Sequence, residues 1–346
     1  MRAYEFLTEA PTQQQVRYMQ RIYAKMQENP AVIDELWNVI STKIADDEGG
    51  MQSRIVTSLQ PANTKPEEDQ TYGSGFLEGL VDAIDKTEGT IEEKIAFAKT
   101  LGQADHIDTK ALLQPLSGWG DWLTGTPFSQ RLFDTMFNFS PLKEDNKGPG
   151  EFALAILSPR ITLKGSKGDI TVDGTPVEVK AGMTSSGGRL SPTEGTLGIL
   201  YNNKEFWESL YPEDKVKAAE CAKERVNANN YSAFLEKYAM GPAESEKILG
   251  AIFKAPKLDG IISAAAKKGT GVTAADLIAI AVKNYGVSQG DEHFLILQKD
   301  IRTSLYFYVD DLAPIINRLS FSLPLMDPDK RSAAQAQLGI LKKARN

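Results

Sequence analysis

The chain has 346 residues, of which 41% are hydrophobic and 25% are charged, and its formal net charge is −7. This length favours two domains or one large domain with insertions, and the apolar fraction is sufficient for a buried core, which argues against wholesale disorder. The one cysteine, Cys221, cannot form an internal disulfide, which argues against a disulfide-stapled secreted fold. The acid excess argues against a non-specific coat on nucleic acid, but it allows a nucleic-acid enzyme with a local basic rim.

The N-terminal region, residues 10–145, is predicted to be helical. Apolar residues recur at helical spacing over five segments: 12–29, 31–46, about 76–86, 91–101 and 127–138. A loop rich in Gly, Pro and Asn is expected over 49–75. No run of about 18 apolar residues occurs, so we expect no membrane-spanning helix. Trp119 and Trp122 are more consistent with a loop anchored on a core than with base stacking.

Beyond residue 145 the pattern changes to an α/β unit. A helix is expected from about Phe152 to Pro159, and strands are expected at Ile161–Leu163, Asp169–Val172, Val177–Lys180, Phe294–Leu297 and Ser304–Val309. A helical insertion of about 204–288 separates the strands, and its last helix is predicted to start at a Thr273–Asp276 capping box and to stop at Gly286. Another helix is expected from about Asp311. The α/β core would therefore span 146–325, followed by a C-terminal tail over 326–346.

The segment Asp169–Lys180 has the pattern of a β-hairpin with a chemically distinct face. Asp173-Gly174 between β-branched runs predicts a two-residue turn, and counting from that turn sets Asp169 opposite Glu178. Side chains alternate along a strand, so one face carries Asp169, Glu178 and Lys180. The core face carries Ile170, Val172, Val177 and Val179.

Two opposed carboxylates favour a cation between them. Directly opposed residues have Cβ atoms about 4.5–5.5 Å apart, and like charges at that separation are destabilising. Hard oxygen ligands suit Mg²⁺ or Mn²⁺. Lys180 would lie beside the ion, where it could orient or deprotonate a water for phosphodiester hydrolysis. The alternative is an amphipathic hairpin whose polar face meets solvent.

Three neighbouring features bear on that alternative. Glu151 follows Gly148-Pro149-Gly150 at a helix start and could supply a third carboxylate, or it could simply complement the helix dipole. Downstream, a donor-rich loop could hold phosphate through Ser186, Gly187, Gly188 and Arg189, or could be only a loop. Five basic residues surround the carboxylates: Arg160, Lys164, Lys167, Lys180 and Arg189.

The order Glu151, then Asp169, then Glu178-Val179-Lys180 resembles the PD-(D/E)XK nuclease superfamily over about residues 148–190, with Gly168 where proline is usual. The resemblance implies a restriction-endonuclease-like mixed sheet with flanking helices and a deoxyribonuclease dependent on Mg²⁺ or Mn²⁺. It implies that Asp169 and Glu178 bind the metal together with the carbonyl of Val179. It also implies that Lys180 is catalytic and that Glu151 is an auxiliary ligand.

A second resemblance concerns Tyr4–Ala10, which is similar to the capsid-targeting peptide of internal head proteins in large tailed phages. In those proteins a prohead protease cuts after a Leu/Ile-x-Glu sequence, here Leu7-Thr8-Glu9. This resemblance implies that residues 1–9 are removed. The two resemblances together imply a phage nuclease that lies inside the phage head, or in the host cytoplasm after infection. The alternative is an ordinary amphipathic N-terminal helix.

Two other classes of function remain open from the sequence. The chain could be a virion structural or DNA-binding protein that keeps the nuclease-like fold with a weak or inactive site. It could also be an interaction protein that inhibits a host enzyme. The first class predicts no cleavage of any form of DNA, and the second predicts capture of a host protein.

Overall fold

The computed structural model describes residues 80, 83–101, 103–137, 148–163, 168–182, 184, 188–328 and 335–345. The chain divides into two compact units, which are residues 1–109 with 122–174 and residues 110–121 with 175–346. The predictions for residues 1–75, namely the targeting peptide, two helices and a loop, lie outside the described residues. Of the helices that are described, none is long and apolar enough to cross a membrane.

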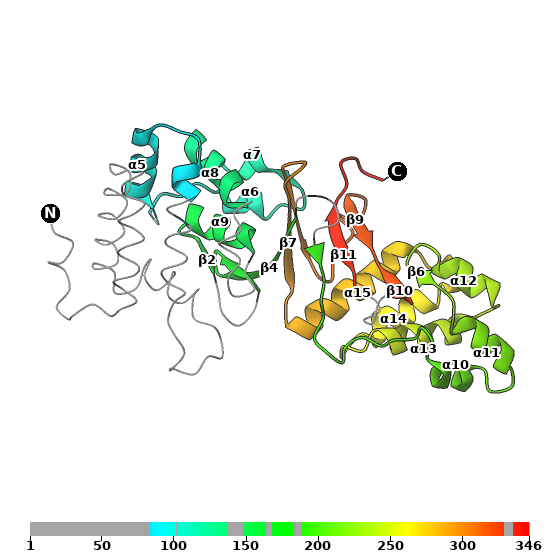
Figure 1. Cartoon of the computed structure of the whole chain (residues 1–346). Coiled ribbons are helices and arrows are strands. Elements are labelled where there is room, and N and C mark those ends of the chain that lie inside the picture. The colour runs from blue at the N-terminus through cyan, green and yellow to red at the C-terminus, as the bar shows by residue number, and fades with distance from the viewer. Residues whose placement is uncertain are drawn as a thin grey trace, which may run out of the picture. The chain divides into compact units, whose positions relative to one another are not determined.

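The first unit packs helices against a β-hairpin (Figure 1). Its main elements are α5 (Ile91–Thr100), α8 (Pro127–Phe137), α9 (Pro149–Leu157), β2 (Ile161–Leu163) and β3 (Ile170–Val172). The strands β2 and β3 pair antiparallel, α8 contacts both α5 and α9, and α9 contacts β2. The predicted helices at 91–101 and 127–138, the helix ending before Pro159 and both strands are thereby confirmed.

Helix α8 forms because its apolar residues recur on one face. Phe128, Leu132, Phe133 and Met136 are each at most 1% exposed, which is the stripe expected of a helix lying on a core. Trp122 is also fully buried, and its ring meets the ring of Phe133 edge-on, with centroids 5.3 Å apart. This burial confirms that Trp122 anchors its segment on a core.

The second unit contains a mixed sheet, which confirms the α/β class. Its strands are β4 (Thr175–Gly182), β7 (His293–Gln298), β8 (Thr303–Tyr308) and the short β1 (Ser117–Gly118). β4 runs parallel to β7, whereas β7 with β8 and β8 with β1 are antiparallel. β1 lies in the region expected to be all-helical, because two residues are too few to show the alternation that predicts a strand. Short helices flank it, α6 (Thr109–Leu112) and α7 (Trp119–Trp122).

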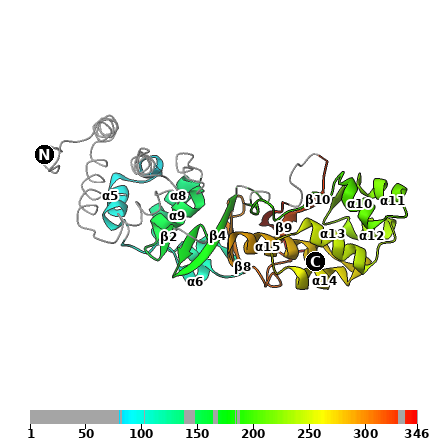
Figure 2. The same ribbon diagram turned by 90° about the horizontal axis from the view of Figure 1, so that it is seen from below.

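The predicted helical insertion is present between β4 and β7. Its helices are α10 (Lys204–Leu210), α11 (Lys215–Cys221), α12 (Tyr231–Lys237), α13 (Pro242–Ile252), α14 (Asp259–Ala266), η3 (Gly269–Gly271) and α15 (Ala274–Gln289). Within it, β6 (Val226–Asn227) pairs with β10 (Pro324–Met326). Figures 1 and 2 both show α15 between the sheet and the helices α13 and α14.

Helix α15 starts as predicted but ends later. Thr273 and Asp276 form the reciprocal capping box, and the helix stops at Gly290, whose φ of +80° is the left-handed conformation that favours glycine. The predicted stop at Gly286 is therefore wrong. A Cβ at Gly286 would come within 2.8 Å of Val309 Cγ2 and 2.6 Å of the carbonyl oxygen of Asp291, so this glycine permits close packing inside the helix.

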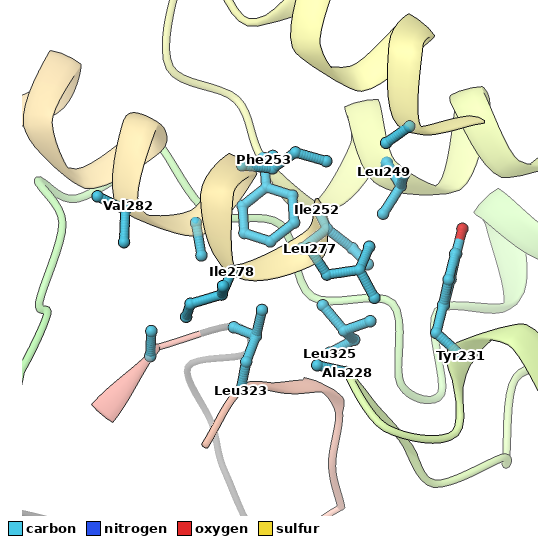
Figure 3. Close-up of a cluster of buried hydrophobic side chains, with 14 of the residues drawn as sticks. Ala228, Tyr231, Leu249, Ile252, Phe253, Leu277, Ile278, Val282, Leu323 and Leu325 are labelled. Atoms are coloured by element: carbon cyan, nitrogen blue, oxygen red, sulfur yellow. The ribbon is translucent and has the colours of Figure 1, made fainter. Parts of the chain in front are cut away.

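The core of the second unit joins the insertion to the C-terminal segments (Figure 3). Leu277 and Ile278 of α15 lie with Ile252 and Phe253 at the end of α13 and with Leu325 of β10, all at most 2% exposed. Each such side chain contributes about 1.5–3 kcal/mol on full burial. The buried residues of α15 run from Leu277 to Gly286, so packing fixes most of this helix.

The C-terminal segments form a second sheet of the same unit. β5 (Gly188–Arg189), β11 (Gln337–Ile340) and β9 (Leu319–Ser322) pair antiparallel in the order β5-β11-β9. The segment expected to be a tail over 326–346 thus contributes a central strand. The helix predicted from Asp311 is wrong, because residues 313–318 form turns. Ala313 precedes Pro314, and the residue before a proline is biased away from the α conformation.

Candidate functional site around Glu178 and Lys180

The predicted turn between the two strands of the motif is present at Asp173-Gly174. These residues have φ values of +48° and +86°, and a two-residue turn of type I′ requires positive φ at both positions. Asp173 also accepts a hydrogen bond from Arg160, with 2.6 Å between Nε and Oδ1. Arg160, expected in a basic rim, is thus ion-paired with the turn.

Glu178 on β4 is enclosed and does not face open solvent. Val177 and Val179 are buried, as predicted, but Glu178 is only 6% exposed as well. Glu178 lies opposite Phe294 in the parallel β4–β7 pair, and neighbouring residues in register share a face. Phe294 belongs to the hydrophobic core of the second unit. The alternative of a solvent-facing polar strand therefore does not hold for Glu178.

Glu178 is held by two donors on one oxygen. Its Oε1 accepts hydrogen bonds from Lys180 Nζ and from the hydroxyl of Tyr285 on α15. Lys180 Nζ also lies 5.4 Å from the centroid of the Tyr285 ring, within the range of a cation–π contact. The Glu178 side chain is 8% exposed and that of Lys180 is 19% exposed. The three residues form a compact, largely enclosed charged cluster.

Gly188 brings β5 close to this cluster. A Cβ at Gly188 would lie 3.1 Å from Lys180 Cβ and 2.8 Å from the carbonyl oxygen of Leu338, so only glycine fits there. Arg189, the next residue, is exposed, and its Nε donates to Gln335 Oε1 at 2.7 Å. Of the predicted phosphate loop, Gly188 thus contacts Lys180, and Ser186 and Gly187 lie outside the described residues.

The two upstream carboxylates belong to the first unit. Glu151 is in the first turn of α9 and 5% exposed. Both its carboxylate oxygens would lie 3.1 Å from a Cβ at Gly148, so the side chain bends back over the helix start, where the helix dipole favours negative charge. Asp169 directly precedes β3 and is partly exposed. Val179, whose carbonyl was predicted to be a ligand, lies between Glu178 and Lys180 on β4.

Glu178 offers a carboxylate oxygen, which is the type of ligand that a hard cation such as Mg²⁺ prefers. Throughout the described residues, no three His, Cys, Asp or Glu side chains form a group that could hold a metal ion. Mg²⁺, however, usually takes only one or two protein carboxylates and completes its six positions with water and substrate phosphate. Glu178 would meet this need through Oε2, because the hydrogen bonds from Lys180 and Tyr285 both use Oε1.

Tyr285 was not identified from the sequence. It lies 107 residues beyond Glu178 and belongs to no motif. The sequence does place it on the apolar stripe of α15 with Ile278 and Val282, at helical spacing, which predicts burial but no partner. Only the packing of α15 on the sheet brings its hydroxyl to Glu178.

Comparison of the chain with protein-family models, with curated proteins and with solved structures finds no match.

Proposed function

We propose that the chain is a metal-dependent nuclease that hydrolyses DNA phosphodiester bonds and has a restriction-endonuclease-like core. The observation that carries this proposal is the enclosed Glu178–Lys180 pair on β4, with Tyr285 as a third member. Taking two charges out of water is costly, and packed apolar residues would often be at least as stable. Enclosed ionisable groups with specific charge partners cluster at functional sites.

Each residue has a role in the proposed site. Glu178 would hold Mg²⁺ or Mn²⁺, with the carbonyl of Val179 as a further ligand and with water and substrate phosphate in the remaining positions. The ligand roles that the motif resemblance implies for Asp169 and Glu151, which belong to the first unit, stay predictions. When bound, the metal supplies polarisation of the scissile phosphate and lowers the pKa of its water. Lys180 donates from the same strand face as Glu178 and would orient the attacking water.

The DNA backbone would be met by the donors that follow β4. Arg189 is exposed at the end of β5, and Ser186 and Gly187 precede this strand in the chain. A guanidinium can bind phosphate through two parallel hydrogen bonds, which positions a nucleic acid without selecting its sequence. This assignment expects weak, salt-sensitive binding, in keeping with the net charge of −7.

The test uses two Glu–Lys–Tyr clusters of the same unit. Glu224 accepts from Lys237 and Tyr238 in the helical insertion, in the same chemical arrangement as Glu178 with Lys180 and Tyr285. We expect Glu178→Gln and Lys180→Met to lower the rate of DNA cleavage in Mg²⁺ by at least about 100-fold. Glu224→Gln and Lys237→Met should change it less than about twofold.

The assay presents supercoiled, linear duplex and single-stranded DNA, each with Mg²⁺, Mn²⁺ or EDTA. Wild-type activity in both Glu178→Gln and Lys180→Met would refute the assignment of the site. One observation favours a second candidate, a virion structural or DNA-binding protein with an inactive site: no group of three potential ligands occurs among the described residues. DNA binding with no cleavage on any substrate would support that candidate.

We further propose, from Leu7-Thr8-Glu9, that the chain is phage-encoded and associated with the phage head, with a prohead protease removing residues 1–9. Co-expression with such a protease, followed by intact-mass measurement, tests this. The expected product begins at Ala10. A full-length chain after complete processing of a known head protein in the same sample would refute it.

A further inference from the structure

We propose that Tyr285 is a positioning residue for Glu178, a role that rests on the proposed nuclease function. Tyr285 is 5% exposed, and its ring packs against Phe294 of β7 with centroids 5.8 Å apart. Its hydroxyl donates to Glu178 Oε1. Because the Tyr285 ring is packed, its hydroxyl stays in position. A tyrosine on the surface could rotate and break the hydrogen bond.

The bond restricts how Glu178 presents its carboxylate. Lys180 and Tyr285 both donate to Oε1, so rotation of the carboxylate would break two hydrogen bonds at once, and Oε2 is left to meet a cation. Replacing a residue that hydrogen-bonds to a metal ligand typically lowers metal affinity or activity about 10–100-fold, because that residue fixes the orientation of the ligand. Since Lys180 also lies over the Tyr285 ring, one residue of α15 touches both members of the pair.

A purely structural role for the hydroxyl makes a different prediction. Phenylalanine keeps the ring, its packing on Phe294 and its contact with Lys180, and it removes only the hydroxyl. If the hydroxyl served folding alone, Tyr285→Phe would change stability and leave metal dependence untouched. Tyr238→Phe is the matched control, because Tyr238 is 8% exposed and donates to Glu224 Oε1 at 2.8 Å, and Glu224 is itself paired with a lysine.

The experiment measures metal dependence with two readouts in the full-length chain. Mn²⁺ binding is titrated calorimetrically without DNA, and cleavage of duplex DNA is followed against Mg²⁺ concentration. For Tyr285→Phe we expect about a tenfold rise in the Mn²⁺ dissociation constant and in the Mg²⁺ concentration that gives half the maximal rate, with a smaller change in kcat at saturating metal. Tyr238→Phe should match the wild type in both.

The outcomes separate this inference from the nuclease proposal. A wild type that binds Mn²⁺ and cleaves DNA, together with a Tyr285→Phe variant that does both equally well, would overturn the role of Tyr285 alone. A wild type that neither binds nor cleaves would overturn the proposed function and this inference with it. Loss of the folded circular-dichroism signal in Tyr285→Phe would also contradict the inference, because it would show that the hydroxyl serves folding.

Discussion

Replacing Lys180, the lysine that pairs with Glu178, should destabilise the protein as well as inactivate it. In Lys180→Met, the carboxylate of Glu178 stays only 8% exposed and keeps Tyr285 as its donor, but it loses its counter-charge. Removing one partner of a buried ion pair costs about 3–5 kcal/mol. Because the Lys180 side chain is 19% exposed, we expect the lower end, about 3 kcal/mol.

The double variant tests the cause of that loss. Glu178→Gln together with Lys180→Met removes both charges, so no unpaired charge remains buried. We therefore expect the double variant to be more stable than the sum of the two single variants predicts, with a coupling energy of about 1–3 kcal/mol. The surface control Lys237→Met, whose side chain is 59% exposed, should change stability little.

Urea unfolding followed by circular dichroism measures all four variants. For a cooperative unit of roughly 150–250 residues, a loss of 3 kcal/mol corresponds to about 6–12 °C in Tm, which gives an independent check. If Lys180→Met costs no more than Lys237→Met, the reasoning from burial is wrong, and the cluster is more open to solvent than the geometry indicates.

Three further results are expected. Gly188→Ala should lower stability by about 1–3 kcal/mol in urea unfolding, because its Cβ would come within 2.8 Å of the backbone oxygen of Leu338, and a stability equal to the wild type would contradict this packing. Burial raises the pKa of the Cys221 thiol to about 11, so Ellman's reagent at pH 8 should label it only on unfolding, and rapid labelling of the native chain would count against its burial. The hydrogen bond from Lys237 lowers the pKa of Glu224 below 4.5, so this ion pair stabilises the fold above pH 4.5 and its contribution is lost as the pH falls further. Lys237→Met should therefore flatten the dependence of stability on pH below 4.5. An unchanged dependence would show that the pair contributes nothing.

Local signals in the sequence predicted the elements that carry the motif. The Asp173-Gly174 turn, the alternation in Val177–Val179 and the Thr273 capping box each depend on neighbouring residues, so each could be identified without the fold. The turn conformation and the capping are set within a few residues, and both match the prediction.

Long-range packing set the features that the sequence could not show. Gly286 has the appearance of a helix stop, yet the helix continues because Val309 lies where a side chain would otherwise be. The alternation of its strand also allowed a solvent-facing Glu178, but Glu178 is enclosed and hydrogen-bonded to Tyr285 of α15. Both differences arise from residues distant in the chain, for which a single sequence carries no signal.

The insertion between β4 and β7 also fixes when the Glu178 cluster can exist. Glu178 and Tyr285 are 107 residues apart, so at about 5–20 residues per second a ribosome needs roughly 5–20 s to travel from one to the other. During that interval the nascent chain carries Glu178 and Lys180 without α15 and without the β7 strand that pairs with β4. A protein built this way completes its charged cluster only after most of it has been synthesised, which delays the appearance of the cluster until the helical insertion is ready to enclose it.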